Sequence, residues 1–235
     1  MDYQLLTWDT DFFGIKTGRI IPTSLQENQL ALILTEMRQK GFQLVYWASD
    51  HQYAYDFQPY SGILADKKKT YEIDLQNINL DSMPLPKAKP YSSSLPLSQL
   101  EKLAIQSGVF SRFALDNRFP HEKFTALYKT WIRKSVSGEM ADEVLVIRQH
   151  NHIAGMVTLS NKNGVGNIGL IAVDEEFRGR KFGQQLLWDA QRWFIQHGCH
   201  TAYVVTQGDN LPACRLYEKC GYQEIKIEFY YHFWL

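Results

Sequence analysis

Hydrophobic and polar positions along the chain repeat with two periods, and each period predicts a different kind of element. Apolar residues three or four positions apart predict amphipathic helices that begin near residues 24, 98, 120, 182 and 210. Runs rich in β-branched and aromatic residues predict strands at 42–48, 71–75, 143–148, 153–160, 168–173, 201–206 and 222–234. From residue 98 onward the order is two helices, three strands, then helix, strand, helix and strand. This order indicates a mixed α/β layer architecture.

Capping residues mark the ends of several predicted helices. Ser24 and Glu27 have the spacing of a capping box, and Gly41 follows the last apolar position of the same helix. Pro120 suits the first position of another helix, because an N–H at that position has no acceptor within the helix. The stretch 51–60 is predicted to form a short helix before a glycine, and 8–21 alternates only loosely.

A proline-rich polar segment divides the chain. Residues 77–90 contain three prolines and have the composition of a linker. We therefore expect a smaller N-terminal α/β domain at 1–85 and a larger domain at 86–235.

Composition and charge exclude several classes of function. Hydrophobic residues make up 45% of the 235-residue chain, and 25 basic residues balance 25 acidic ones. A general nucleic-acid binder usually carries a basic excess, so we expect no nucleic-acid partner. No apolar run approaches the roughly 20 residues that cross a bilayer, and the first residues do not have the pattern of a signal peptide.

The three cysteines indicate a reducing compartment. Cys199, Cys214 and Cys220 are odd in number and lack the spacing of metal ligands. We expect reduced thiols that pack in the core of a cytoplasmic protein, and no metal site.

The stretch 166–190 has the composition of a phosphate-binding turn. A predicted strand is followed by a polar turn, and the next helix begins among basic residues and glycines. N–H groups at a helix start have no intrahelical acceptor, and the macrodipole adds partial positive charge, so such an end suits a pyrophosphate. Neither the P-loop nor the three-glycine dinucleotide motif is present.

The spacing Arg178-x-x-Lys181-x-Gly183 resembles the acetyl-CoA loop of the GCN5-related N-acetyltransferase (GNAT) superfamily, usually Arg/Gln-x-x-Gly-x-Gly/Ala. Here Lys181 replaces the first glycine, the residue whose small size and backbone freedom ease a close approach to the pyrophosphate. If Lys181 has the ordinary conformation of a first helical turn, its N–H can still donate to the pyrophosphate, and its ammonium adds positive charge to the loop.

A second motif makes the resemblance more specific. Residues 210–222, NLPACRLYEKCGY, match the family pattern Asn-x-x-Ala-x-x-Leu/Phe-Tyr-x-x-x-Gly-Phe/Tyr at every marked position. The motif begins about 27 residues after Gly183, with a predicted strand between, and this order is what the family implies.

The resemblance implies a GNAT fold, a mixed central sheet flanked by helices, and acetyl-CoA as the acyl donor. It implies that the N–H near Ile171 polarises the thioester carbonyl and that Tyr217 protonates the leaving thiolate, although Tyr217 could instead only pack or hydrogen-bond the sulfur. Asn210 corresponds to a pantetheine contact, and it could also cap its helix. The implied cofactor-binding residues are Ala172, Val173, Arg178, Gly179, Arg180, Lys181, Phe182, Gly183, Asn210 and Ala213.

Shorter strings narrow the choice of acceptor. Leu6-Thr7-Trp8-Asp9, Phe12-Phe13-Gly14, Ser111-Arg112-Phe113 and Trp131-Ile132 resemble acetyltransferases of dTDP-linked 4-amino-4,6-dideoxygalactose. Arg112 could hold a diphosphate in a bidentate contact and Phe113 could stack on a base or sugar, with Ser111 beside them. Alternatively, Phe113 belongs to the core and Arg112 pairs with Asp116 or Asp142.

Two segments of the chain resemble each other and suggest an internal repeat. Residues 41–75 can be laid over 198–233, and Gln58 stands where the second copy has Tyr217. We expect the N-terminal part to be a reduced GNAT half that binds no cofactor, or else a coincidence between two β-α-β units.

Three functions remain open. The first is a nucleotide-amino-sugar N-acetyltransferase, with a small-molecule substrate. The second is an acetyltransferase of proteins, peptides or small amines, and the third is a non-catalytic acyl-CoA-binding module. Asp116, His121 and Glu139 are candidates for the general base. The sequence leaves open whether the protein forms a homodimer.

Overall fold

A computed structural model describes residues 2–235. The chain folds into two compact units. One unit consists of the residues up to Lys69 together with Ile227–Leu235, and the other is Thr70–Lys226. The boundary expected at residue 85 thus lies inside the second unit. The strands β4 (Ile63–Asp74) and β10 (Gln223–Trp234) contribute residues to both units.

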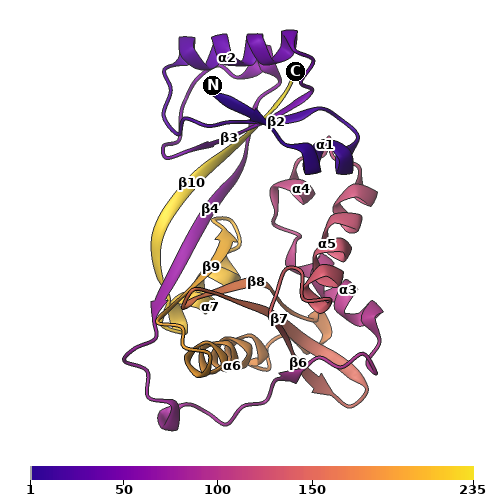
Figure 1. Cartoon of the computed structure of the whole chain (residues 1–235), viewed down its shortest axis with the longest axis vertical. Helices are drawn as coiled ribbons and strands as arrows, with labels where there is room; N and C mark the ends of the chain where they lie inside the picture. Colours follow the sequence, from indigo (N-terminus) through magenta and orange to yellow (C-terminus); the bar gives the residue numbers. More distant parts are fainter. Residues whose placement is uncertain (1) are drawn as a thin grey trace. The chain divides into compact units, whose positions relative to one another are not determined.

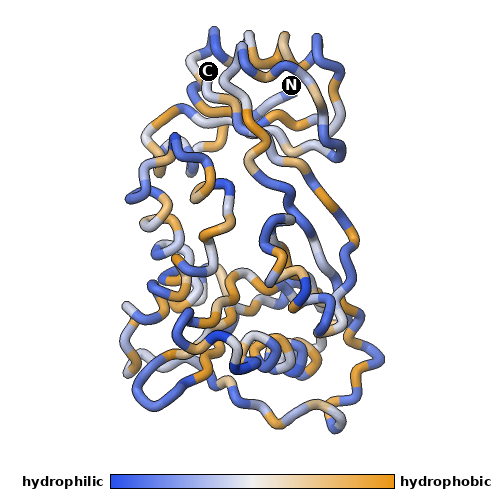
Figure 2. Tube along the Cα trace, turned by 180° about the vertical axis from the view of Figure 1, so that it is seen from behind, coloured by the Kyte–Doolittle hydropathy of each residue, from blue (hydrophilic) through white to orange (hydrophobic). Residues whose placement is uncertain are grey.

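The first unit is a small sheet with two helices. Its strand order is β1-β2-β3-β10-β4, and β2 and β3 are parallel neighbours on either side of a helix in the sequence. Its elements, besides β4 and β10, are β1 (Tyr3–Leu5), α1 (Thr7–Phe13), β2 (Thr17–Ile20), α2 (Glu27–Gln39), β3 (Leu44–Ser49) and the 3-10 turn η1 (Gln58–Tyr60). Along α2 hydrophobic and hydrophilic residues alternate (Figure 2), and Leu34 and Met37 are fully buried against the sheet.

The second unit is a larger mixed sheet with helices on its faces. Its strand order is β10-β4-β9-β8-β7-β6-β5, in which β8 and β9 are parallel and β5 to β8 are antiparallel neighbours. Its elements are η2 (Leu80–Ser82), β5 (Lys89–Pro90), α3 (Leu97–Ser107), α4 (Arg112–Leu115), α5 (His121–Val136), β6 (Glu143–Gln149), β7 (His152–Lys162), β8 (Val165–Val173), η3 (Glu175–Phe177), α6 (Phe182–Gln196), β9 (Thr201–Gln207) and α7 (Leu211–Lys219). Figure 1 shows α6 beside one face of this sheet and α3 with α5 beside the other.

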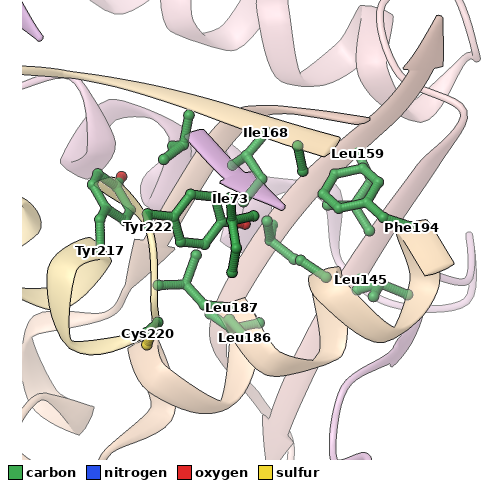
Figure 3. Packing of buried hydrophobic residues seen from close by; sticks show 14 of the residues in the cluster. Ile73, Leu145, Leu159, Ile168, Leu186, Leu187, Phe194, Tyr217, Cys220 and Tyr222 are labelled. Carbon is green, nitrogen blue, oxygen red and sulfur yellow. The ribbon is translucent and has the colours of Figure 1, made fainter. Parts of the chain in front are cut away.

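The core of the second unit lies between α6 and the sheet. Leu186, Leu187 and Phe194 of α6 are fully buried against β6 to β9, as Figure 3 shows. Each such side chain contributes about 1.5–3 kcal/mol relative to exposure. The amphipathic helix predicted to begin near residue 182 is therefore confirmed.

The predicted repeat can be compared with the strand orders of the two units, although the reduced GNAT half stays a prediction. In the first unit β10 lies between β3 and β4, and in the second β4 lies between β9 and β10. In the first unit β10 thus separates β4 from the parallel pair β2 and β3. In the second unit β4 separates β10 from the parallel pair β8 and β9. A different strand order would have ruled out a reduced GNAT half. The first unit has only η1 where the second has α7.

Two local predictions were wrong, and one stretch for which no element was predicted is structured. The helix expected at 51–60 is only η1. The loosely alternating stretch 8–21 contains α1 and β2. The capping box lies two residues later than expected, because the side chains of Gln26 and Gln29, and not those of Ser24 and Glu27, bond to the backbone at the start of α2.

The predicted linker is held against α6 by one buried carboxylate. The Oδ2 atom of Asp189 accepts hydrogen bonds from the N–H groups of Lys87 at 3.1 Å and Ala88 at 2.8 Å, and its Oδ1 accepts from Gln185 at 3.0 Å. Asp189 is only 4% exposed. The carboxylate thus joins two backbone N–H groups of the linker to α6.

We expect Asp189→Ala to lower the free energy of unfolding by about 1–3 kcal/mol, because the N–H groups of Lys87 and Ala88 and the amide of Gln185 all lose their buried acceptor. Denaturant unfolding followed by circular dichroism measures this. Gln196→Ala, at an exposed position of the same helix, is the control and should stay within about 0.5 kcal/mol of the wild type. Equal stability of Asp189→Ala and the control would contradict the role of the carboxylate.

Candidate functional site

The parallel strands β8 and β9 pair along only part of their length. Their register runs from Val165 opposite Thr201 to Ile168 opposite Val204. Beyond this point β8 continues to Val173 and β9 continues to Gln207 without further pairing between them. The two strands therefore open toward their carboxyl ends, and the β9-facing side of β8 keeps backbone groups for an added partner.

Hydrogen bonds to β7 fix the direction of the amides at this opening. The N–H of Leu170 donates to Thr158 at 2.8 Å, and the N–H of Asp174 donates to the carbonyl of Ala154 at 2.9 Å. Successive amides of an extended strand point to opposite sides. The N–H groups of Ile171 and Val173 consequently point away from β7, toward the side where β9 has diverged.

A short polar turn joins β8 to α6. Asp174 caps η3 by accepting from the N–H of Glu176 at 3.1 Å, and it forms an ion pair with Lys102 of α3 at 2.9 Å. Burial alone would raise the pKa of Asp174, but the contacts with Lys102 and the Glu176 N–H hold it below its usual value. The pair therefore fixes the start of the turn to α3.

The start of α6 presents several amides without helical acceptors. The first hydrogen bond of the helix joins the N–H of Gln185 to the carbonyl of Lys181 at 3.1 Å. The amides of Phe182, Gly183 and Gln184 therefore precede the regular helical bonding, which is the arrangement that binds a phosphate. A Cβ atom on Gly183 would lie 2.9 Å from Leu216 of α7, so glycine lets the two helices approach closely here.

Lys181 does not have the helical conformation that we expected. Its φ of 63° and ψ of 15° are left-handed, and it is the N-cap of α6 rather than a residue of the first turn. This conformation favours glycine, the residue that the family has at the position. The loop thus keeps its backbone shape at the cost of local strain. The Lys181 side chain is exposed.

We expect Lys181→Gly to raise the free energy of unfolding by about 1 kcal/mol, because it relieves a left-handed lysine. Thermal melting at several salt concentrations measures the gain. Any part of the change in stability that comes from removing the lysine charge should depend on the salt concentration, because salt screens exposed charges. Lys181→Ala is the control: it removes the charge but keeps a Cβ, so its melting temperature should not rise. Equal gains for the two variants would assign the effect to charge instead of conformation.

Basic side chains surround the same turn. Nε of Arg178 donates to the carbonyl of Val173 at 3.3 Å, which places this guanidinium at the open edge of β8. The guanidinium of Arg180 lies 5.2 Å from the ring centre of Phe177. Both arginines and Gly179 are exposed. The turn therefore combines unbonded amides with local positive charge in an otherwise neutral protein.

The second motif forms the helix α7 together with its N-cap and the residues that follow it. The side chain of Asn210 accepts from the N–H of Ala213 at 3.3 Å and caps α7. Tyr217 is 3% exposed, and its ring lies 5.6 Å from that of Tyr71 and 6.2 Å from that of Tyr222. Figure 3 shows it at the end of the core cluster away from Phe194. Burial first, and then the nearby Cys214, raise the pKa of Tyr217, so its hydroxyl keeps its proton near neutral pH.

The predicted acceptor residues lie together on one short helix. Ser111 occupies the N-cap position of α4 without a capping hydrogen bond from its side chain, and it is 4% exposed. Phe113 packs on Phe119 with ring centres 5.4 Å apart. The guanidinium of Arg112 lies 4.4 Å from the centre of the Phe113 ring. The structure thus places Phe113 in the core, as the alternative interpretation held, while a role in acceptor binding stays a prediction.

Two of the candidate bases are engaged in ion pairs. Asp116 is 2% exposed, and Arg118 contacts both of its oxygens at 2.8 and 3.3 Å. Hydrogen bonds from Ser137 and Lys134 lower the pKa of Glu139. A lowered pKa makes a carboxylate a weaker base. His121 is exposed, with its ring centre 5.9 Å from that of Phe124.

Two residues at the site were missed by the sequence analysis. Asp174 directly follows the predicted strand, and an aspartate there is a recognisable cap of a turn, so a signal was present. Thr158 had no such signal, because its role depends on an irregular register between β7 and β8.

Comparisons with known proteins agree with this geometry. A model described as "Acetyltransferase (GNAT) family" matches residues 109–222. Spore coat polysaccharide biosynthesis protein SpsD of Bacillus subtilis is 26% identical over 134 residues, 57% of this chain and 46% of that protein. Streptothricin acetyltransferase of Escherichia coli is 31% identical over 71 residues, 30% of this chain and 41% of that protein. The chain therefore spans less than half the length of either curated relative.

Solved structures share the fold of nearly the whole chain. A putative GNAT acetyltransferase from Novosphingobium aromaticivorans has a TM-score of 0.56 at 14% identity, covering 99% of this chain and 87% of its own. A tandem GNAT protein from the clavulanic acid biosynthesis pathway has a TM-score of 0.57 at 12% identity, covering 93% and 75%.

The fold is therefore the GNAT fold, a mixed sheet flanked by helices. Residues 109–222, which match the acetyltransferase (GNAT) family model, hold both motifs. The described residues 2–235 contain no helix with the length and apolar character needed to cross a membrane.

Proposed function

We propose that the protein is an acetyl-CoA-dependent N-acetyltransferase that acetylates an amino sugar, and that a dTDP-linked amino-deoxysugar is its substrate. The observation that carries this proposal is the opening between β8 and β9, whose amides face away from β7 directly before the phosphate-type turn of α6. An extended pantetheine arm would pair with the edge of β8 as an added strand.

The residues of the turn fit the diphosphate of coenzyme A. The amides of Phe182 and Gly183 supply donors, and Arg178 and Arg180 supply charge. Because Oδ1 of Asn210 is used by the helix cap, its amide nitrogen is the group that would donate to a pantetheine carbonyl. Family resemblance assigns the same roles to these positions.

Two groups would act on the reacting atoms. The N–H of Ile171 would donate to the thioester oxygen as negative charge develops during attack by the neutral amine. Tyr217 would then give its proton to the sulfur as the carbon–sulfur bond breaks, and the proton that the attacking nitrogen loses would pass through water and restore the Tyr217 hydroxyl. Although burial raises the pKa of Tyr217, the same apolar surroundings raise the proton affinity of a thiolate formed beside it.

The sugar acceptor is supported by two indications. The relative SpsD is named for polysaccharide biosynthesis, and the strings around Ser111 resemble acetyltransferases of dTDP-amino sugars. The guanidinium of the half-buried Arg112 would suit the diphosphate of such a substrate. A thioester-cleavage assay with acetyl-CoA and a matched panel of dTDP-amino sugars, UDP-amino sugars, polyamines and peptides tests this.

We expect turnover to be highest with a dTDP-amino sugar, and Arg112→Ala to weaken binding of dTDP alone. Arg133→Ala, at an exposed arginine of α5 paired with Glu101, is the control. Turnover confined to peptides or polyamines would refute the sugar acceptor but keep the acetyltransferase. Acetyl-CoA binding without cleavage for any amine would favour a non-catalytic module.

A small basic amine is the second candidate acceptor. Its support is the 31% identity to a protein named streptothricin acetyltransferase, over residues that make up 30% of this chain. Such a substrate would be favoured by an acidic cleft. Inclusion of streptothricin in the panel separates the two candidates.

A further inference from the structure

The register between β7 and β8 changes at one threonine. Val157 lies opposite Ile171, whereas Leu159 lies opposite Ile168. Thr158 alone therefore faces the two residues Gly169 and Leu170, which form a β-bulge in β8. The bulge lies directly before Ile171, the residue proposed to contact the thioester oxygen.

The side chain of Thr158 replaces the missing ladder bond of the bulge. Its Oγ1 atom accepts from the N–H of Leu170 at 2.8 Å, and Thr158 is 2% exposed. A Cβ atom on Gly169 would lie 2.9 Å from the same Oγ1, so the hydroxyl fills the space that this glycine leaves. The hydroxyl therefore gives this buried N–H an acceptor, which buried backbone groups nearly always have.

The bulge also changes which face of the sheet each residue of β8 occupies. Before the bulge, Gly166 and Ile168 face α6: a Cβ on Gly166 would meet Phe194, and Ile168 belongs to the α6 core. After it, Ile171 and Val173 pack against that core. Without the extra residue the alternation of the strand would continue unchanged, and the N–H of Ile171 would point toward β7.

We propose that Thr158 is a positioning residue that holds the β8 bulge through its hydroxyl and so directs the Ile171 N–H at the thioester carbonyl. This inference deepens the proposed function and rests on it. Thr158 itself touches neither the thioester nor the amine; it acts through the backbone of Leu170.

The carbonyl stretching band of 13C-labelled acetyl-CoA bound to the protein tests this without any acceptor. In the wild type a directed N–H should lower the frequency relative to free acetyl-CoA in an aprotic solvent. Thr158→Val removes the hydroxyl at nearly constant volume, and we expect the bound band to move back to higher frequency. Thr158→Ser keeps the hydroxyl and should restore the wild-type band.

Turnover supplies a second readout. With any amine that the wild type acetylates, Thr158→Val should lose about 10- to 100-fold in kcat, the cost of a misplaced catalytic contact. Its KM for acetyl-CoA should stay within about twofold, because the phosphate turn is unchanged. Leu159→Val, a core truncation at the next position of β7, controls for destabilisation and should keep both kcat and the band.

Gly169 provides an independent check by a double-mutant cycle. Gly169→Ala should impair kcat in the wild-type background and much less in Thr158→Ala, because the smaller residue makes room for the added Cβ. A wild-type band without a low-frequency shift would refute the Ile171 contact and the inference with it. A shifted wild-type band that Thr158→Val leaves unchanged would overturn the inference about Thr158 alone.

Discussion

Tyr217→Phe should lower kcat by about 10²- to 10⁴-fold, the range that a positioned general acid contributes, and leave acetyl-CoA affinity nearly unchanged. The tyrosine is buried and its pKa is raised by that burial, so the wild-type hydroxyl stays protonated through neutral and mildly alkaline pH. Steady-state rates together with calorimetric binding of acetyl-CoA measure the two effects separately.

Tyr222→Phe is the matched control for this experiment. Tyr222 is also fully buried, its ring lies 6.2 Å from that of Tyr217, and the family pattern allows phenylalanine at its position. We expect its kcat to stay within about threefold of the wild type. Unchanged turnover in Tyr217→Phe would exclude the acid and leave that tyrosine a packing role.

Ile171→Pro should lower kcat by about 10²- to 10³-fold, the cost of removing one donor to a developing oxyanion. Proline removes the N–H that points away from β7, and a strand accepts proline where its N–H makes no ladder bond. Ile171→Val keeps the N–H and the β-branched shape, so it should remain active within about threefold.

Folding and acetyl-CoA binding of Ile171→Pro have to be checked, because the ring also restricts the preceding residue. A more conservative variant replaces the peptide N–H of Ile171 with an ester oxygen by semisynthesis. Wild-type kcat in a folded ester variant would refute the contact between this amide and the thioester.

The sequence predicted the elements of the second unit well because their chemistry is local. The helix α6 has an apolar face that repeats every three or four residues, and the motif at 210–222 carries its own N-cap in Asn210. The turn before α6 was found from its charges and glycines. Each of these signals lies within one short segment.

Other features depend on packing that no short segment reveals. The strand β4 reads ILADKKKTYEID, whose lysines are typical of exposed segments, so only its end was predicted. The helix α1 has seven residues, too few for the helical period to be recognised. Lys181 is left-handed although lysine disfavours that conformation, so here the loop geometry overrides the preference of the residue.

The contribution of β10 to the first unit has a consequence for biosynthesis. Tyr231 and Phe233 are at most 1% exposed in the core of the unit that begins the chain. A ribosome synthesises residues 70–226 before it reaches this strand, so the first unit cannot complete its core cotranslationally ahead of the second. Trp47 of β3 belongs to the same core, and its ring centre lies 5.3 Å from that of Tyr231. Nascent chains stalled before residue 227 should therefore leave this core unfinished and susceptible to protease.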